Sequence, residues 1–161
     1  MILQERMYTF IKLGEYLEKD IYKNSREIFS RVEAHNPWFT QDNIKRALDT
    51  WREQLSPDMI ISWLNPYKLK EVLNPKRVLI VMPGNIPLVG FHDFISVLIS
   101  GHKVVVKMSK NDNILLKVLI DKLISISPKF KNSIFFIDDI AKRDFDAVIA
   151  TGSNNSAHYF E

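Results

Sequence analysis

The first 73 positions carry apolar residues at the spacing of amphipathic helices. One set falls at alternating steps of four and three residues, which places it on a single helix face, and consists of Leu3, Met7, Phe10, Gly14, Leu17 and Ile21. A second helix is predicted from Asn24, because Glu27 stands at capping-box spacing before the next apolar cluster.

Two further helices are predicted from their starting signals. Thr40 can cap a helix, and Phe39 and Ile44 have the spacing of a hydrophobic staple around it. Ser56 followed by Pro57 combines a cap with a proline at the first helical position. The sequence therefore predicts about four helices in this first part of the chain.

From Lys76 onward, short β-branched runs alternate with helical stretches. Strands are predicted over residues 77–82, 103–108, 133–137 and 146–151, and helices over residues 89–100 and 113–126. This alternation is typical of an α/β fold whose parallel strands are joined by right-handed crossovers. We predict an open parallel, Rossmann-like sheet flanked by helices, residues 74–161, preceded by an N-terminal helical region, residues 1–73.

The composition narrows the possible chemistry. With 161 residues, 46% of them hydrophobic and 25% charged, the chain resembles globular proteins and not disordered ones. Cysteine is absent, which excludes disulfides, thiolate metal sites and covalent catalysis by a thiol of this chain. The four histidines lack the spacing of metal ligands, so we expect no metal. No apolar stretch suits a membrane span or a signal peptide, and we expect a cytoplasmic protein.

The net charge of +3 gives only a weak indication of anionic partners. Five aromatic residues of the helical region could stack on nucleic acid or face lipid, namely Phe10, Phe29, Trp38, Trp51 and Trp63. Most of them fall at core-periodic positions, which favours packing between helices. We therefore expect no nucleic-acid partner.

Candidate chemistry lies in three turns, because ligands of open parallel sheets bind beyond the carboxyl ends of the strands. The first turn contains Gly84, which allows a sharp backbone turn, and Pro87, which suits an early helical position. Between them Asn85 offers an amide donor of the kind that an oxyanion hole requires. The alternative is an ordinary Gly-Asn turn without a chemical role.

The second turn contains Lys107, Ser109 and Lys110. Many dinucleotide-binding domains place an acidic residue at this distance from the first glycine turn, where it binds the ribose 2′-hydroxyl. Lysines would suit a 2′-phosphate instead, although they could also belong to a solvated loop. In the third turn, Gly152 and Ser153 could bind an anion at a helix entrance or could simply cap that helix.

Three ordered motifs carry a family resemblance: asparagine between two prolines, PGNIP, then GHKVVVKMS, and then ATGS. They resemble the cofactor domain of the aldehyde dehydrogenase superfamily. The sequence around these motifs, including HNPWFT and FDAVIATGSNNSAHYFE, is similar to that of the LuxC-type acyl-CoA reductases of that superfamily.

The resemblance implies a fatty acyl-CoA reductase, in which a cysteine accepts the acyl group and reduced nicotinamide delivers hydride to release an aldehyde. Asn85 would then be the oxyanion donor, Lys107 and Ser109 would hold the adenosine ribose or its phosphate, and Gly152 and Ser153 would face the pyrophosphate. Lys110 stands where many members have a ribose-binding glutamate, so the resemblance favours NADP over NAD.

The absence of cysteine departs from this family pattern. We therefore expect an N-terminal fragment whose nucleotide-binding region is truncated and which is inactive by itself, with acyl-CoA as the substrate of the full-length enzyme. A fragment with an open sheet edge could also form a homo-oligomer. The alternative is a non-catalytic module that binds coenzyme A or another phosphate-bearing ligand.

Overall fold

The helices predicted for the first region are present. The computed structural model describes residues 1–23, 25–110, 112–140 and 144–151. In this part of the chain the N-terminal region forms α1 (Leu3–Lys19), α2 (Ser25–His35), α3 (Gln41–Gln54) and α4 (Pro57–Leu64), with a short 3-10 helix, η1 (Ile21–Lys23), after α1. Asn24, where we predicted the second helix to begin, lies outside the described residues.

The starts of α3 and α4 follow from their sequences. The Thr40 hydroxyl accepts a hydrogen bond from the Asn43 amide at 3.3 Å, and α3 begins at the residue after Thr40. Phe39 and Ile44, on either side of this cap, are fully buried, as a hydrophobic staple requires. Pro57 is the first residue of α4, where its missing amide hydrogen would have no helical partner.

The second region forms a four-stranded sheet in which every pairing is parallel. The strands are β1 (Arg77–Val81), β2 (Lys103–Lys107), β3 (Ile134–Phe136) and β4 (Ala147–Ala150), in the spatial order β3-β2-β1-β4. The chain adds β2 and β3 on one side of β1 and then returns to place β4 on the other side. The predicted open parallel sheet is confirmed.

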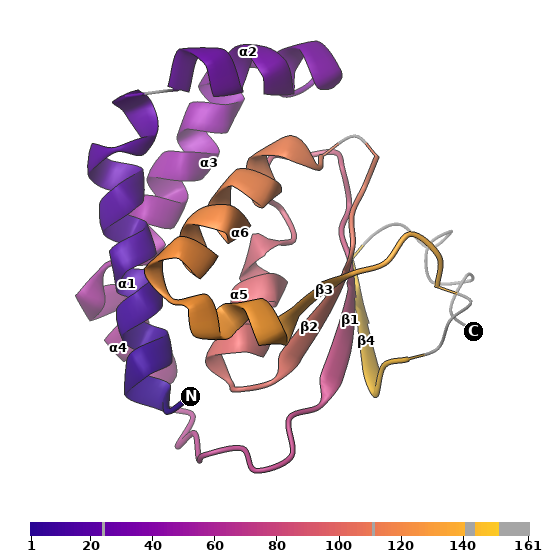
Figure 1. Cartoon of the computed structure of the whole chain (residues 1–161). Coiled ribbons are helices and arrows are strands. Elements are labelled where there is room, and N and C mark those ends of the chain that lie inside the picture. Colours follow the sequence, from indigo (N-terminus) through magenta and orange to yellow (C-terminus); the bar gives the residue numbers. More distant parts are fainter. Residues whose placement is uncertain (24, 111, 141–143, 152–161) are drawn as a thin grey trace.

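Two helices connect the first three strands. α5 (Phe91–Ile99) joins β1 to β2, and α6 (Ile114–Ile126), followed by the 3-10 helix η2 (Pro128–Ser133), joins β2 to β3. Figure 1 shows α5 and α6 between the sheet and the N-terminal helices, with α1 packed on both of them. One buried apolar cluster extends from Phe10 of α1 through Phe94 of α5 to Ile134 of β3. In the described part of the chain, no helix has the length and apolar character that crossing a membrane needs.

The strands differ in how deeply they are buried. β1 and β2 each bury three consecutive apolar residues, 78–80 and 104–106, which agrees with strands covered on both faces. β4 is more exposed, and Val148 keeps 39% of its surface. The start of β4 is fixed by Asp146, whose carboxylate accepts the Arg77 amide hydrogen at 2.7 Å.

Two details of the first turn differ from the sequence-based prediction. Helix α5 begins at Phe91, so Pro87 lies in the turn before the helix and not in its first turn. The left-handed backbone needed to reverse direction occurs at Leu88, with φ of 59°, and not at Gly84. A leucine tolerates this conformation only where its surroundings hold it in place.

A buried arginine connects the start of α1 to the end of α5. Arg6 is 3% exposed, and its Nε donates to the Ile99 carbonyl at 2.8 Å while its Nη1 donates to the Met1 carbonyl. Gly101, which follows α5 with φ of +93°, lies against this guanidinium group. A Cβ atom at position 101 would lie 3.3 Å from the guanidinium carbon, a tight contact, and the positive φ favours glycine at this position.

Replacing Gly101 with alanine is therefore expected to lower the free energy of unfolding by about 1–3 kcal/mol, because the added Cβ opposes the positive φ. Urea denaturation followed by circular dichroism measures this change. Gly101→Asn is the matched comparison, since asparagine adds the same Cβ but adopts positive φ more readily, and it should lose less stability. Wild-type stability in Gly101→Ala would contradict this account.

Candidate functional site

The first and second candidate turns lie side by side at the carboxyl edge of the sheet. β1 and β2 pair in register, with Val81 opposite Lys107, so both strands end at the same level. Just beyond the last pair, the Met82 amide donates to the Lys107 carbonyl at 3.0 Å. The loop that follows β1 and the loop that follows β2 therefore begin next to each other. We call them the asparagine loop, residues 83–90, and the lysine loop, residues 108–113.

Asn85 is exposed in the asparagine loop and borders a cavity of about 480 Å³ between this loop and α3. Within the described part of the chain, its side-chain amide forms no hydrogen bond, so it can donate to a ligand. It does not stand at the entrance of α5, because α5 begins only at Phe91. The structure thus places this predicted residue at a cavity and leaves its role untested.

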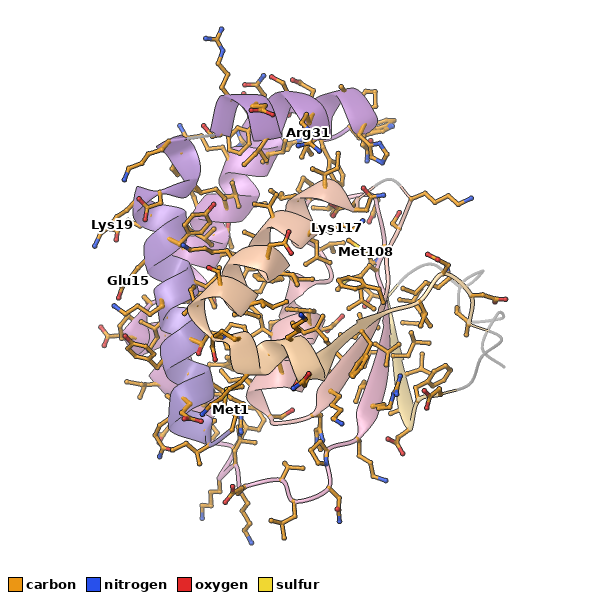
Figure 2. All side chains as sticks on the ribbon, in the orientation of Figure 1. Met1, Glu15, Lys19, Arg31, Met108 and Lys117 are labelled. Atoms are coloured by element: carbon orange, nitrogen blue, oxygen red, sulfur yellow. The ribbon has the colours of Figure 1, made fainter. Side chains whose placement is uncertain are left out.

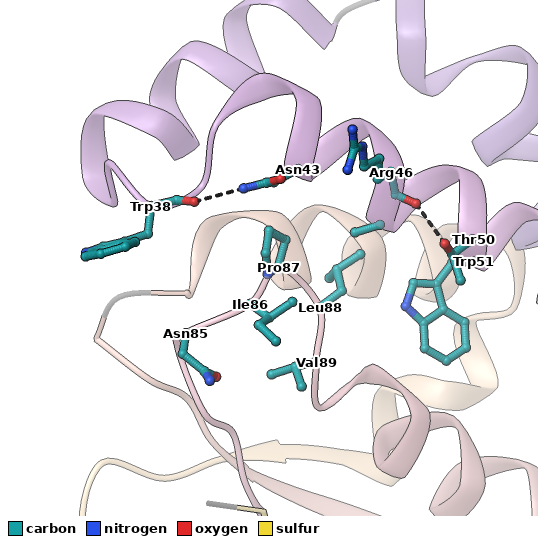
Figure 3. A pocket seen from close by; sticks show the side chains of 11 residues that line it. Trp38, Asn43, Arg46, Thr50, Trp51, Asn85, Ile86, Pro87, Leu88 and Val89 are labelled. Carbon is teal, nitrogen blue, oxygen red and sulfur yellow. Dashed lines mark hydrogen bonds between the residues drawn. The ribbon is translucent and has the colours of Figure 1, made fainter.

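The cavity beside Asn85 has a mainly apolar lining with a few polar groups from α3. Figure 3 shows Ile86 and Val89 of the asparagine loop on one side and Arg46 and Trp51 of α3 on the other. Trp38, which is 80% exposed, stands at its border. Of the aromatic residues that we expected to pack between helices, Trp38 is thus the one that does not.

The lysine loop borders a second cavity, of about 530 Å³, at the carboxyl ends of β2 and β3. Lys107, Ser109 and Lys110, the three residues predicted from the second turn, all line it. The structure therefore brings this predicted set together around one space. Asp138, which follows β3, is the carboxylate among its described lining residues.

A third lysine of this cavity escaped the sequence analysis. Lys117 lies near the start of α6 and lines the same space as Lys107, Met108 and Lys110, and Figure 2 shows it beside Met108. In sequence it looks like an ordinary solvated helix position. The signal that could have indicated it is its place one helical turn after Asn113, at the end of α6 that points to the carboxyl edge.

The third candidate turn is only partly described. Gly152 and Ser153 lie outside the described residues, whereas the Thr151 hydroxyl donates to the Asp93 carboxylate at 3.2 Å. This contact joins the end of β4 to the first turn of α5, between the two strands where the strand order reverses. Ligands of doubly wound sheets bind at such a reversal point.

The described titratable groups around this edge do not gather into a metal-binding cluster. His92 contacts the rings of Trp51 and Trp63, and its Nδ1 lies 3.9 Å from the Asp93 carboxylate. Among the described residues, no three histidine, aspartate or glutamate side chains come together as metal ligands would.

A model of the acyl-CoA reductase (LuxC) family matches residues 11–160, a range that includes the linings of both cavities. The chain belongs to the LuxC acyl-CoA reductase family. Membership implies NAD(P)-dependent reduction of an acyl-CoA. No curated protein and no solved structure matches the chain.

In this LuxC-family chain, one buried carboxylate connects the two loops. Asp112 of the lysine loop is 8% exposed and accepts the amide hydrogen of Leu88, in the asparagine loop, at 3.3 Å. Its burial raises the pKa of the carboxyl to about 6, and the bond from Leu88 and the nearby His35 offset this only in part. The other carboxylate oxygen, Oδ1, has no hydrogen-bond partner among the described residues.

This raised pKa makes stability depend on pH. Between about pH 4 and pH 6 the folded chain binds more protons at Asp112 than the unfolded chain, so stability from this group falls as pH rises through that range. Asp112→Asn has no carboxyl to ionise at this position, so its stability does not fall in this way. Above pH 7 its free energy of unfolding should exceed that of wild type by up to about 3 kcal/mol.

Urea denaturation of both proteins at several pH values from 4 to 8 measures this difference. The exposed Asp121 of α6 offers a control, Asp121→Asn, that removes a carboxylate without burial. A difference between Asp112→Asn and wild type that does not change with pH would contradict the buried-charge explanation.

Proposed function

We propose that this chain forms the NADP-binding part of a fatty acyl-CoA reductase. The observation that carries the proposal is the cavity at the end of β2, where Lys107, Lys110 and Lys117 border one space with Ser109. Three ammonium groups and a hydroxyl are donors that suit a phosphate, and Asp138 is the one carboxylate among the described lining residues, so these residues together carry a positive charge.

The position of these lysines supports NADP over NAD. In dinucleotide-binding folds the residue after the second strand faces the adenosine ribose, and an acidic residue there suits a free 2′-hydroxyl. Here β2 ends in Lys107 and continues into Ser109 and Lys110. A 2′-phosphate would meet cations at this point, whereas it would be repelled by a carboxylate.

Asn85 completes the proposal on the substrate side. Its exposed amide would donate to the acyl oxygen, and the apolar lining of the neighbouring cavity would accept the acyl chain. A reduced nicotinamide, when bound, supplies the hydride. Because these 161 residues contain no cysteine, the proposal assigns them binding and oxyanion stabilisation, and no acyl transfer to a thiol.

The cofactor preference predicts a binding difference. Wild-type chain should bind NADPH more tightly than NADH, and Lys107→Ala with Lys110→Ala should weaken NADPH binding by roughly 10- to 100-fold, because charge-assisted hydrogen bonds to the 2′-phosphate are lost. NADH binding should change much less. Isothermal titration calorimetry measures all four affinities.

A matched control uses Lys68→Ala with Lys70→Ala, which removes the same charge from an exposed segment that leads to the amino end of β1. Coenzyme A serves as a third ligand. Equal affinity for NADPH and NADH, or tight binding of coenzyme A without NADPH, would contradict the proposal and favour the phosphate-binding module instead.

Lys117 gives a separate prediction. As a helix residue that lines the same cavity, it should add to the attraction for a phosphate, so Lys117→Ala should weaken NADPH binding by roughly three- to tenfold while NADH binding stays close to wild type. The same calorimetry measures this change. An unchanged NADPH affinity would exclude Lys117 from the site.

A further inference from the structure

The last residue of α2 and the residue after it contact the two candidate loops. The Nε2 atom of His35, the last residue of α2, lies 2.6 Å from the carbonyl oxygen of Lys110 in the lysine loop. The next residue, Asn36, donates from Nδ2 to the carbonyl oxygen of Gly84 in the asparagine loop at 3.3 Å. Two adjacent residues of the helical region thus hold backbone groups of both loops.

The bond from Asn36 acts directly next to Asn85. The Gly84 carbonyl and the Asn85 amide hydrogen belong to the same planar peptide unit. A hydrogen bond to this carbonyl therefore restrains the orientation of the peptide that leads into Asn85. The amide of Asn36 is itself oriented, because its Oδ1 accepts the Trp38 amide hydrogen at 3.1 Å. With only 5% of its surface exposed, Asn36 is well placed to restrain this peptide.

Asp112 supplies the second link between the loops. It pairs with Ser109 in an isolated β-bridge within the lysine loop, while its carboxylate accepts the Leu88 amide hydrogen. Leu88 is the residue with the left-handed backbone that turns the asparagine loop. One carboxylate therefore fixes the conformation that a leucine adopts least readily.

We propose that Asn36 and Asp112 are positioning residues: Asp112 joins the asparagine loop to the lysine loop, and Asn36 restrains the peptide before Asn85, so that a nucleotide bound at the lysines also orders Asn85. This inference rests on the proposed function. It assigns a role to the polar start of the HNPWFT segment, to which the sequence analysis gave none.

The burial of the Asp112 carboxylate lowers the stability of the fold, which supports a role for this residue other than stabilisation. A buried carboxylate with one oxygen unpartnered among the described residues destabilises the fold relative to a neutral isostere. Groups that lower stability in this way are expected mainly at functional sites. The bonds described for Asn36 and Asp112 also converge on backbone atoms of the turn that carries Asn85, where position matters most.

The first test needs no ligand. Amide hydrogen exchange in the full chain, measured by NMR, should become roughly tenfold faster at Leu88 in Asp112→Ala, because its acceptor is lost. Asp112→Asn keeps an oxygen acceptor and should restore slow exchange. Amides of β1 and β2 serve as internal references for intact folding.

A second variant addresses Asn36 separately. Asn36→Asp keeps the oxygen that accepts from Trp38 but can no longer donate to Gly84, so the backbone nitrogen resonance of Asn85 should shift. In wild type, NADPH should also shift the side-chain amide resonances of Asn85. In Asn36→Asp and Asp112→Ala, NADPH should still shift the lysine loop but no longer Asn85.

Failure of this inference can be told from failure of the proposed function. Unchanged exchange at Leu88 in Asp112→Ala, or an unchanged Asn85 resonance in Asn36→Asp, overturns the positioning role whatever binds. If wild type binds no NADPH, the proposed function fails, and these ligand-free measurements still decide the positioning role. If Asp112→Ala does not fold, the Asn36→Asp resonance decides it.

Discussion

The parallel pairing of β1 with β2 is the constraint on which the rest of the arrangement depends. Both strands bury three consecutive apolar residues, and their register places Val81 opposite Lys107. Because the strands run in the same direction, both chains leave the sheet at one edge. The asparagine loop and the lysine loop therefore begin next to each other.

The N-terminal helices take part in this edge as well as in the core. α3 forms one wall of the cavity beside Asn85, and the end of α2 reaches the backbone of both loops through His35 and Asn36. The proposed nucleotide side of the molecule and the proposed acyl side thus share structural supports. In a reductase of this family, such sharing would let the cofactor and the acyl group be held in a fixed relation.

Much of the fold could be predicted because its signals are local. The cap at Thr40, the periodic apolar face of α1 and the buried runs of β1 and β2 each depend on residues close in sequence. For the candidate site, the sequence predicted three separate turns but not the contacts between them. The bonds of Asn36 to Gly84 and of Asp112 to Leu88 span 48 and 24 residues, and no local pattern signals such partners. The left-handed backbone of this turn lies at Leu88 and not at a glycine, so no local pattern predicts it.

The most direct test of the central claim is a crystal structure of the chain with NADPH bound. Our account predicts that the adenosine part lies in the cavity at the end of β2 and that its 2′-phosphate contacts Lys107 or Lys110. A nucleotide bound at another surface, or one whose 2′-phosphate points into solvent away from these lysines, would contradict it.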